Sequence, residues 1–341
     1  VFGKISNFTG INNDNLIIKL LLVLIAIILS VITFYLIENT FRKKFEIKAI
    51  SFFLGIIIIY SVSIFSLYNL KMLQEKQFPQ ITKELKNRTW FETKQHFRPC
   101  FQRKKYFCSF YSNNEKSVYI IGDSVMASLQ NELKNALFNR KLNLITMTNA
   151  GCDFLKISKK SDENIFCNNE IYEERFKKIK ENTNSILILH INYNNKIFKK
   201  DDLSQDNFVK DVNRLLNLGH KIIFINPLPQ MSIHTSNELS KKLLLNKDNL
   251  NEFLNNEDNF VGIDFKDFKN NSRHIVDILN QIYHKNFYKL NVNNIFCNSR
   301  IEGKCIAHDE KNLLFIDNSH LSNFSANLVV KKLLKLIDQI N

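Results

Sequence analysis

The sequence predicts a three-layer α/β/α domain with a parallel sheet, preceded by two transmembrane helices. From residue 117 onward, short apolar runs alternate with segments of helical periodicity, which is typical of a parallel sheet covered on both faces. Two long uncharged runs lie before residue 70. We therefore expect two transmembrane helices in residues 1–70, a juxtamembrane connector in residues 71–116 and the α/β domain in residues 117–341.

The two uncharged runs, residues 20–37 and 49–68, are each long enough to cross the hydrocarbon core of a bilayer. A buried core helix or a cleaved signal peptide would also be apolar. Two such runs in succession, with no small-residue cleavage pattern after the first, favour membrane spans. The loop between them, residues 38–48, contains Arg42 and three lysines, which favours the cytoplasmic side for this loop. The lipid bilayer is thus an expected partner, and the chain after Lys71 is expected outside the cytoplasm.

The composition is basic, with 47 Lys and Arg against 33 Asp and Glu and a formal net charge of +14. Such an excess can indicate binding to nucleic acid. Here the lysines are scattered among many asparagines, as on a solvated surface, and no run of five or six like charges occurs. We therefore expect no nucleic-acid partner.

All six cysteines follow the second apolar run and form three pairs that are local in sequence. No C-x-x-C motif occurs and no histidine has zinc-ligand spacing, so we expect no metal site. Buried free thiols are the alternative to disulfides, but three disulfides in an oxidising compartment fit the predicted topology better. The expected pairs are Cys100–Cys108, Cys152–Cys167 and Cys297–Cys305.

Short apolar runs predict the strands, and repeats of about four residues predict the helices between them. The expected strands are residues 117–121, 143–147, 185–191, 221–226 and 259–264. The apolar face of the helix after the first strand is formed by Val125, Leu129, Leu133 and Leu137. The apolar face of the last helix is formed by Phe324, Leu328 and residues 333–337.

Two motifs indicate a serine nucleophile with its base. Gly122-Asp123-Ser124 lies directly after a strand and before a helix, where the helix N–H groups can stabilise negative charge near Ser124. Asp317 precedes His320 by three residues just before the last helix, so one loop can supply a base and the group that orients it. A helix start capped by Asp317 would give the same D-x-x-H pattern.

Two further loops contain candidate oxyanion donors. Gly151 follows the second strand, where its N–H can face an oxyanion, and Asn192 follows the third strand, where its side-chain amide can donate a hydrogen bond. Together with the Ser124 N–H, these groups are the expected oxyanion hole. His190, at the end of the third strand, is interpreted as a packing or substrate-contact residue.

Ser124, Gly151, Asn192 and His320, in this order and at strand ends, resemble the four blocks of the SGNH hydrolase family. The third block reads His190-Ile191-Asn192-Tyr193 where the family has G-x-N-D. The resemblance implies a flavodoxin-like three-layer fold and catalysis by Ser124, Asp317 and His320.

A second resemblance concerns residues 37–43, which are similar to the I-E-x-P-F-R stretch after the last helix of acyltransferase family 3 membrane domains; Thr40 replaces the proline. In fused members a further span leads to an SGNH domain, and Asn226-Pro227-Leu228-Pro229 is similar to their fourth-strand loop. The resemblance implies that residues 1–70 end a membrane acyltransferase domain whose catalytic histidines precede Val1.

The combined resemblance implies an O-acyltransferase, with acetyl as the group, that modifies a cell-surface polysaccharide such as lipopolysaccharide. It also implies the bacterial inner membrane, with the SGNH domain in the periplasm. No cofactor is expected in this chain, since the acetyl group would come from acetyl-CoA through the membrane domain. Two alternatives remain: an O-acetylesterase or lipase with water as acceptor, and a non-catalytic, membrane-tethered glycan-binding module.

Overall fold

The computed structural model describes about three fifths of the chain and divides it into two units, Val1–Pro79 and Gln80–Asn341. The described residues are 27, 31, 34–35, 55–66, 94–95, 98–100, 107–111, 116–154, 168–194, 202–232, 235, 238–239, 261–309 and 311–341.

In the first unit, residues 55–66 form a helix. Its isoleucine, valine, tyrosine and phenylalanine side chains are exposed. Most of the two expected membrane spans, residues 20–37 and 49–68, lies outside the described residues. Within the part of the chain that the structure describes, no helix is both long and apolar enough to cross a membrane.

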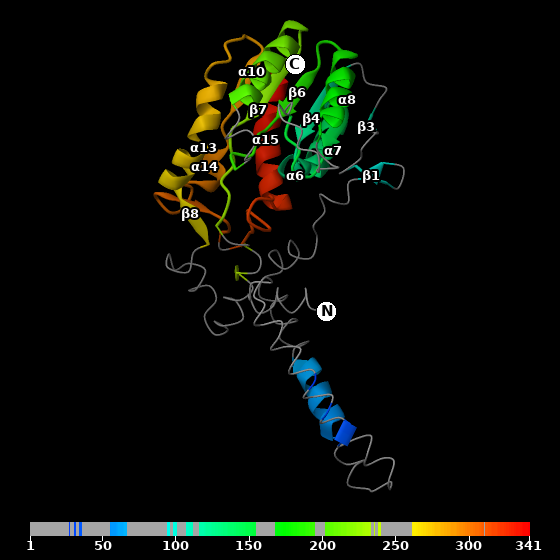
Figure 1. Cartoon of the computed structure of the whole chain (residues 1–341), viewed down its shortest axis with the longest axis vertical. Helices are drawn as coiled ribbons and strands as arrows, with labels where there is room; N and C mark the ends of the chain where they lie inside the picture. The colour runs from blue at the N-terminus through cyan, green and yellow to red at the C-terminus, as the bar shows by residue number, and fades with distance from the viewer. Residues whose placement is uncertain are drawn as a thin grey trace. The chain divides into compact units, whose positions relative to one another are not determined.

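The second unit contains the sheets and the helices that pack on them (Figure 1). The strands are β1 (Lys94–Gln95), β2 (Arg98–Pro99), β3 (Cys108–Phe110), β4 (Ser117–Gly122), β5 (Asn143–Thr148), β6 (Ile186–Leu189), β7 (Lys221–Ile225), β8 (Gly262–Asp264), β9 (Phe287–Leu290) and β10 (Lys304–Ile306). The helices are α6 (Ser124–Ala127), α7 (Gln130–Phe138), α8 (Asn169–Lys180), α10 (Asp202–Asn217), α13 (Phe265–Leu279), α14 (Asn293–Phe296) and α15 (Asn323–Ile340).

The main sheet has the strand order β3-β5-β4-β6-β7-β9. Only β3 is antiparallel to its neighbour, and the other adjacent pairs are parallel. Every residue of β4, β5 and β6 is buried, which explains why β6 and residues 118–121 of β4 are continuous apolar runs rather than alternating ones. The predicted α/β fold is therefore confirmed, with a sheet that is mostly rather than wholly parallel.

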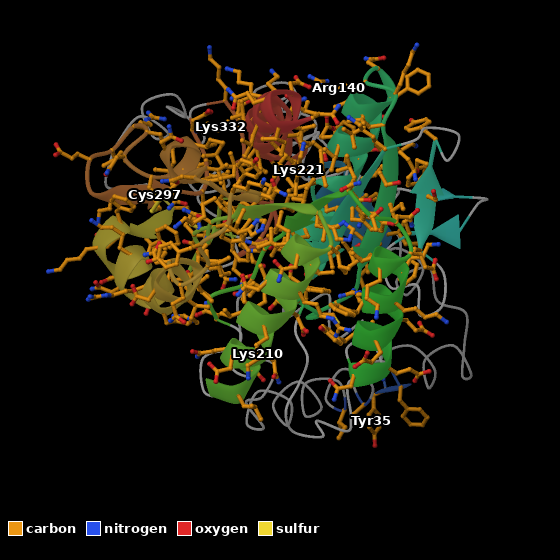
Figure 2. All side chains as sticks on the ribbon, turned by 90° about the horizontal axis from the view of Figure 1, so that it is seen from above. Tyr35, Arg140, Lys210, Lys221, Cys297 and Lys332 are labelled. Carbon is orange, nitrogen blue, oxygen red and sulfur yellow. A yellow bond between two sulfur atoms is a disulfide. The ribbon has the colours of Figure 1, made fainter. Side chains whose placement is uncertain are left out.

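Helices cover both faces of this sheet. Seen from above, α7 and α15 lie on one side of the strands, and α8 and α10 lie on the other (Figure 2). The packing of α7 with α15 brings Arg140 and Asp338 together at 2.8 Å on the surface. On the opposite face, the ring of Phe176 in α8 lies 5.0 Å from the Arg214 guanidinium of α10. The three layers place the carboxyl ends of the parallel strands at one edge of the domain.

The expectation that residues 259–264 form a strand of the main sheet is wrong. In this region the structure has β8, which pairs antiparallel with β10 in a separate two-stranded sheet and is only partly buried. The last parallel strand is instead β9, in which the half-buried Tyr288 precedes the exposed Lys289. As an edge strand, β9 has a sheet neighbour on one side only, so its sequence need not be a continuous apolar run.

The two predicted helical faces also need revision. Val125, Leu129, Leu133 and Leu137 are all buried, but the helix is interrupted between α6 and α7. In α15 the buried stripe runs through Val329, Leu333 and Ile337, with Ala326, Val330 and Leu334 beside it. Phe324 and Leu328 are only partly buried, so the apolar face is centred differently from the prediction.

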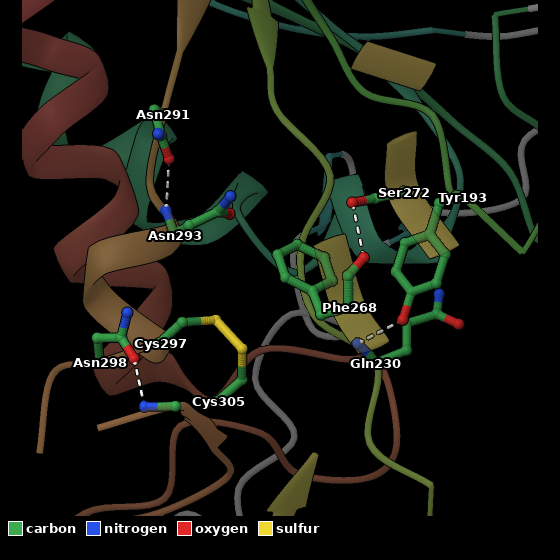
Figure 3. The surroundings of a disulfide bond; sticks show 10 residues. Tyr193, Gln230, Phe268, Ser272, Asn291, Asn293, Cys297, Asn298 and Cys305 are labelled. Carbon is green, nitrogen blue, oxygen red and sulfur yellow. Dashed lines mark hydrogen bonds between the residues drawn. A yellow bond between two sulfur atoms is a disulfide. The ribbon is translucent and has the colours of Figure 1, made fainter. Parts of the chain in front are cut away.

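Disulfides join two of the expected cysteine pairs, Cys100–Cys108 and Cys297–Cys305. Cys152 is also disulfide-bonded, and its expected partner Cys167 lies outside the described residues. Figure 3 shows Cys297–Cys305 beside a turn in which the Asn298 side chain accepts a hydrogen bond from the Gly303 N–H at 2.7 Å. This disulfide joins Cys305 in β10 to Cys297 at the end of α14, and the chain continues from β10 towards residues 313–320.

The Cys297–Cys305 disulfide should stabilise the domain by restricting the unfolded chain. Its sequence separation of 8 corresponds to about 2–3 kcal/mol of loop-closure entropy. The double variant Cys297→Ala/Cys305→Ala should lose about this much free energy of unfolding, measured by urea denaturation without reductant. Reductant should remove the difference between the two proteins, and an unchanged urea midpoint in the double variant would contradict the prediction.

Candidate active site

Ser124 is the first residue of α6 and follows β4 directly across the turn formed by Gly122 and Asp123. The Asp123 carboxylate caps this helix: its Oδ1 accepts hydrogen bonds from the N–H groups of Val125 at 2.8 Å and Met126 at 3.4 Å. Gly122 has φ +155°, and a Cβ at this position would lie 2.6 Å from Met126 Cγ. The turn therefore requires glycine at 122, as its position in the sequence predicts.

The loop before α15 brings an imidazole and a carboxylate to Ser124. His320 Nε2 lies 2.8 Å from Ser124 Oγ, and His320 Nδ1 lies 2.7 Å from Asp317 Oδ2. The other carboxylate oxygen, Asp317 Oδ1, accepts the backbone N–H groups of Ser319 at 2.9 Å and His320 at 2.8 Å. With its Nδ1 proton donated to Asp317, the imidazole can accept the Ser124 hydroxyl proton at Nε2.

This loop is fixed by the segment that follows β7. The hydroxyl of the buried Thr235 donates to the Asp317 carbonyl at 2.9 Å, and the Met231 N–H donates to the Asn318 carbonyl at 2.7 Å. Sequence reasoning missed Thr235 and Met231. The resemblance of Asn226-Pro227-Leu228-Pro229 drew attention to this segment, but gave no sign that it touches the Asp317 loop.

The segment after β6 in turn braces the segment after β7. The Tyr193 hydroxyl accepts the Gln230 N–H at 3.1 Å (Figure 3). The Tyr193 ring packs edge to face against Phe268 of α13, with centroids 5.7 Å apart. Three loops that are distant in sequence thus support one another around Asp317.

Opposing effects set the pKa of Asp317. Burial raises the pKa of this carboxyl, but hydrogen bonds from the His320 ring and from the N–H groups of His320 and Ser319 outweigh burial and hold the pKa well below its usual range. Asp317 is therefore ionised at neutral pH, as a group that stabilises a protonated His320 must be.

The loops of the two expected oxyanion donors begin beside the nucleophile turn. Thr148 at the end of β5 pairs with Gly122, and Leu189 at the end of β6 pairs with Ile121. Gly151, with φ +60°, lies in the turn after β5.

The Asn192 Oδ1 accepts the Asn194 N–H at 2.9 Å, so this side chain shapes its own loop. The roles of Gly151 and Asn192 as oxyanion donors remain predictions.

His190 is 2% exposed, and its Nδ1 lies 3.2 Å from the Ile225 carbonyl oxygen. Burial lowers its pKa, against the opposing effects of the Asp123 charge and the Ile225 carbonyl. The sequence left two interpretations of His190, packing or substrate contact. Its burial and its contact with Ile225 at the end of β7 correspond to packing.

The site combines a hydroxyl, an imidazole and a carboxylate within hydrogen-bonding distance. Such a set can transfer an acyl group through a serine ester, because the base removes the hydroxyl proton while the carboxylate orients the base. Across the described ranges, no group of three or more His, Cys, Asp and Glu side chains could hold a metal ion.

Comparisons with known proteins agree with this fold. A family model described as "SGNH domain (fused to AT3 domains)" matches residues 93–335. Among solved structures, the chain is similar to the periplasmic domain of a lipopolysaccharide acetyltransferase from Salmonella ser. Paratyphi A. The two share 17% sequence identity and a TM-score of 0.50, over 66% of this chain and 84% of that one.

A candidate acylhydrolase from Bacteroides fragilis is also similar, with 12% identity and a TM-score of 0.37, over 66% of this chain and 86% of that one. Among curated protein sequences nothing matches.

The depressed pKa of Asp317 predicts a contribution to folding that is lost in acid. A carboxyl whose pKa is lower in the folded chain stabilises the fold above its unfolded pKa of about 4, and this contribution disappears as the pH falls through the folded pKa. Asp317→Asn should therefore lower the free energy of unfolding at neutral pH. Urea unfolding of both proteins at decreasing pH should show the difference shrinking below about pH 4.

The matched control is Asp206→Asn, an exposed position on α10, which should give no such pH-dependent difference. A difference between the wild type and Asp317→Asn that stays constant down to the lowest pH at which both fold would contradict the prediction.

Proposed function

The chain belongs to the family of SGNH domains that are fused to AT3 domains, and on this premise we propose that it is a serine-dependent O-acyltransferase. The observation that supports this most directly is the hydrogen-bonded series Ser124–His320–Asp317, with distances of 2.8 and 2.7 Å. Ser124 is the nucleophile, His320 the general base and Asp317 the group that orients and stabilises His320.

The first half of the proposed reaction forms an acyl-enzyme. His320 Nε2 takes the proton of Ser124 as Oγ attacks the carbonyl carbon of an acyl donor, and Asp317 stabilises the protonated imidazole. The N–H groups of Ser124 and Gly151, together with the Asn192 side chain, hold the oxyanion. When the tetrahedral oxyanion collapses, the bond to the leaving group breaks and the leaving group takes the proton from His320. The acyl group then remains on Ser124.

The second half transfers the group to a hydroxyl. His320 removes the proton of an acceptor hydroxyl, whose oxygen attacks the acyl-enzyme. The bond between Ser124 Oγ and the acyl carbon then breaks, His320 returns the proton to Ser124 Oγ, and the new ester leaves. With water as acceptor the same steps would make the chain an esterase. The acceptor is decided by how the site binds a sugar and excludes water, rather than by the three residues themselves.

We propose acetyl as the group and a cell-surface polysaccharide, such as lipopolysaccharide, as the acceptor. The supporting comparison is the likeness of fold to the periplasmic domain of a lipopolysaccharide acetyltransferase. The disulfides support an oxidising compartment, in agreement with a periplasmic domain. The proposal includes anchoring in the bacterial inner membrane through residues 1–70 and acetyl-CoA as the ultimate donor.

A fluorophosphonate probe tests whether Ser124 is activated. The full chain should be labelled at Ser124, and His320→Ala should slow the labelling by about three orders of magnitude or more, because the serine loses its base. Peptide mapping and the labelling rate measure both effects. His284→Ala, a histidine in the loop after α13, is the matched control and should label like the wild type. Labelling that does not depend on His320 would contradict the proposed mechanism.

Measurement of acetylated glycan distinguishes the transferase from the esterase. Cells that express the wild-type gene should contain more O-acetylated surface polysaccharide than cells with the Ser124→Ala variant, because only a transferase adds the group. Chemical release and quantification of acetate from purified polysaccharide provides the measurement. More acetate in the Ser124→Ala cells would exclude the transferase and identify an esterase.

A further inference from the structure

Buried charge within the described part of the chain is concentrated near the nucleophile turn. Among the described Asp, Glu, Lys and Arg side chains, the buried ones are Asp123, Asp153 and Arg175, which are 4%, 4% and 2% exposed. A buried charge is costly unless it is paired or hydrogen-bonded, so three of them in one region need an explanation.

Arg175 projects from α8 onto the loop that follows β5. Its Nη1 donates a hydrogen bond to the Cys152 carbonyl at 3.2 Å. Within that loop the Cys152 N–H donates to the Asn149 carbonyl at 3.2 Å, and the Asn149 N–H donates to the Gly122 carbonyl at 3.1 Å. A series of hydrogen bonds thus connects Arg175 to the nucleophile turn through the loop that contains Gly151.

The charge of Arg175 also acts on two buried carboxylates. Burial lowers the pKa of Arg175 to about 10, and the negative charges of Asp153 and Asp123 oppose this lowering. The guanidinium is therefore protonated at neutral pH. Asp123 directly precedes Ser124, so without a nearby positive charge its carboxylate would repel the oxyanion that forms when Ser124 reacts.

We propose that Arg175 is a positioning residue of the active site. Its guanidinium fixes the loop of residues 149–153 against the nucleophile turn, and its charge balances Asp123 and Asp153, so that negative charge can develop at Ser124. The inference rests on the proposed function, because it assumes an oxyanion at this site. Arg175 does not touch the reacting atoms and acts through the Gly151 loop and Asp123.

The test compares one charged and one neutral replacement of Arg175 in the full chain. Arg175→Lys keeps the positive charge, Arg175→Gln keeps a donor but loses the charge, and Lys177→Gln removes an exposed charge from the same helix as a matched control. The labelling endpoint with a fluorophosphonate counts reactive Ser124 per chain. The kcat for 4-nitrophenyl acetate is then expressed per reactive site, which removes the effect of misfolded protein, and KM is measured in the same assay.

Arg175→Gln should lower kcat per reactive serine by about 10- to 100-fold with KM changed less than about 3-fold, since the loss concerns the transition state. Arg175→Lys should restore kcat to within about 5-fold of the wild type, and Lys177→Gln should equal the wild type.

Equal kcat per reactive serine in Arg175→Gln and the wild type would overturn the inference and leave the proposed function intact. Equal losses in the Lys and Gln variants would also overturn it, because charge would then not matter. If Arg175→Gln does not fold, Arg175→Lys decides: a folded variant more than about 100-fold below the wild type would contradict charge compensation. A wild type that neither labels nor hydrolyses the ester would refute the proposed function and this inference with it.

Discussion

The hydrogen bond between Ser124 Oγ and His320 Nε2 joins residues 196 positions apart, and the rest of the site depends on it. Ser124 is placed by the central strand β4, whose neighbours β5 and β6 supply the loops on either side. His320 is placed by the loop before α15, a helix that packs against α7 next to the nucleophile turn. The contact therefore forms only when the sheet and both of these helices are in place, which couples the chemistry to the folding of the whole α/β domain.

Backbone N–H groups hold the two carboxylates next to this contact in place. Asp317 accepts two N–H groups of its own loop, and its carbonyl accepts the Thr235 hydroxyl. Asp123 does the same for α6 by accepting the N–H groups of Val125 and Met126. Both carboxylates thereby keep a fixed position, which is what preorganised charge stabilisation requires.

Local patterns in the sequence predicted part of the fold and part of the site. Four of the five apolar runs correspond to strands of the main sheet, because parallel strands buried on both faces are mostly apolar. The edge strand β9 is short, contains the exposed Lys289 and was missed, while the apolar residues 259–264 were assigned to the wrong sheet. Asp317 and His320 could be proposed together because they are three residues apart. Thr235 and Arg175 could not, since their contacts with Asp317 and Cys152 connect positions that no local pattern relates.

In the proposed mechanism, Ser124 carries the acyl group between donor and acceptor. The most direct measurement is rapid quenching of the full chain after mixing with an activated acetyl ester, followed by peptide mass spectrometry. We expect an acetyl group on the oxygen of Ser124 that appears before turnover is complete and disappears when an acceptor is added. No acetylated peptide from a chain that turns over the ester, or an acetyl group on a different residue, would contradict it.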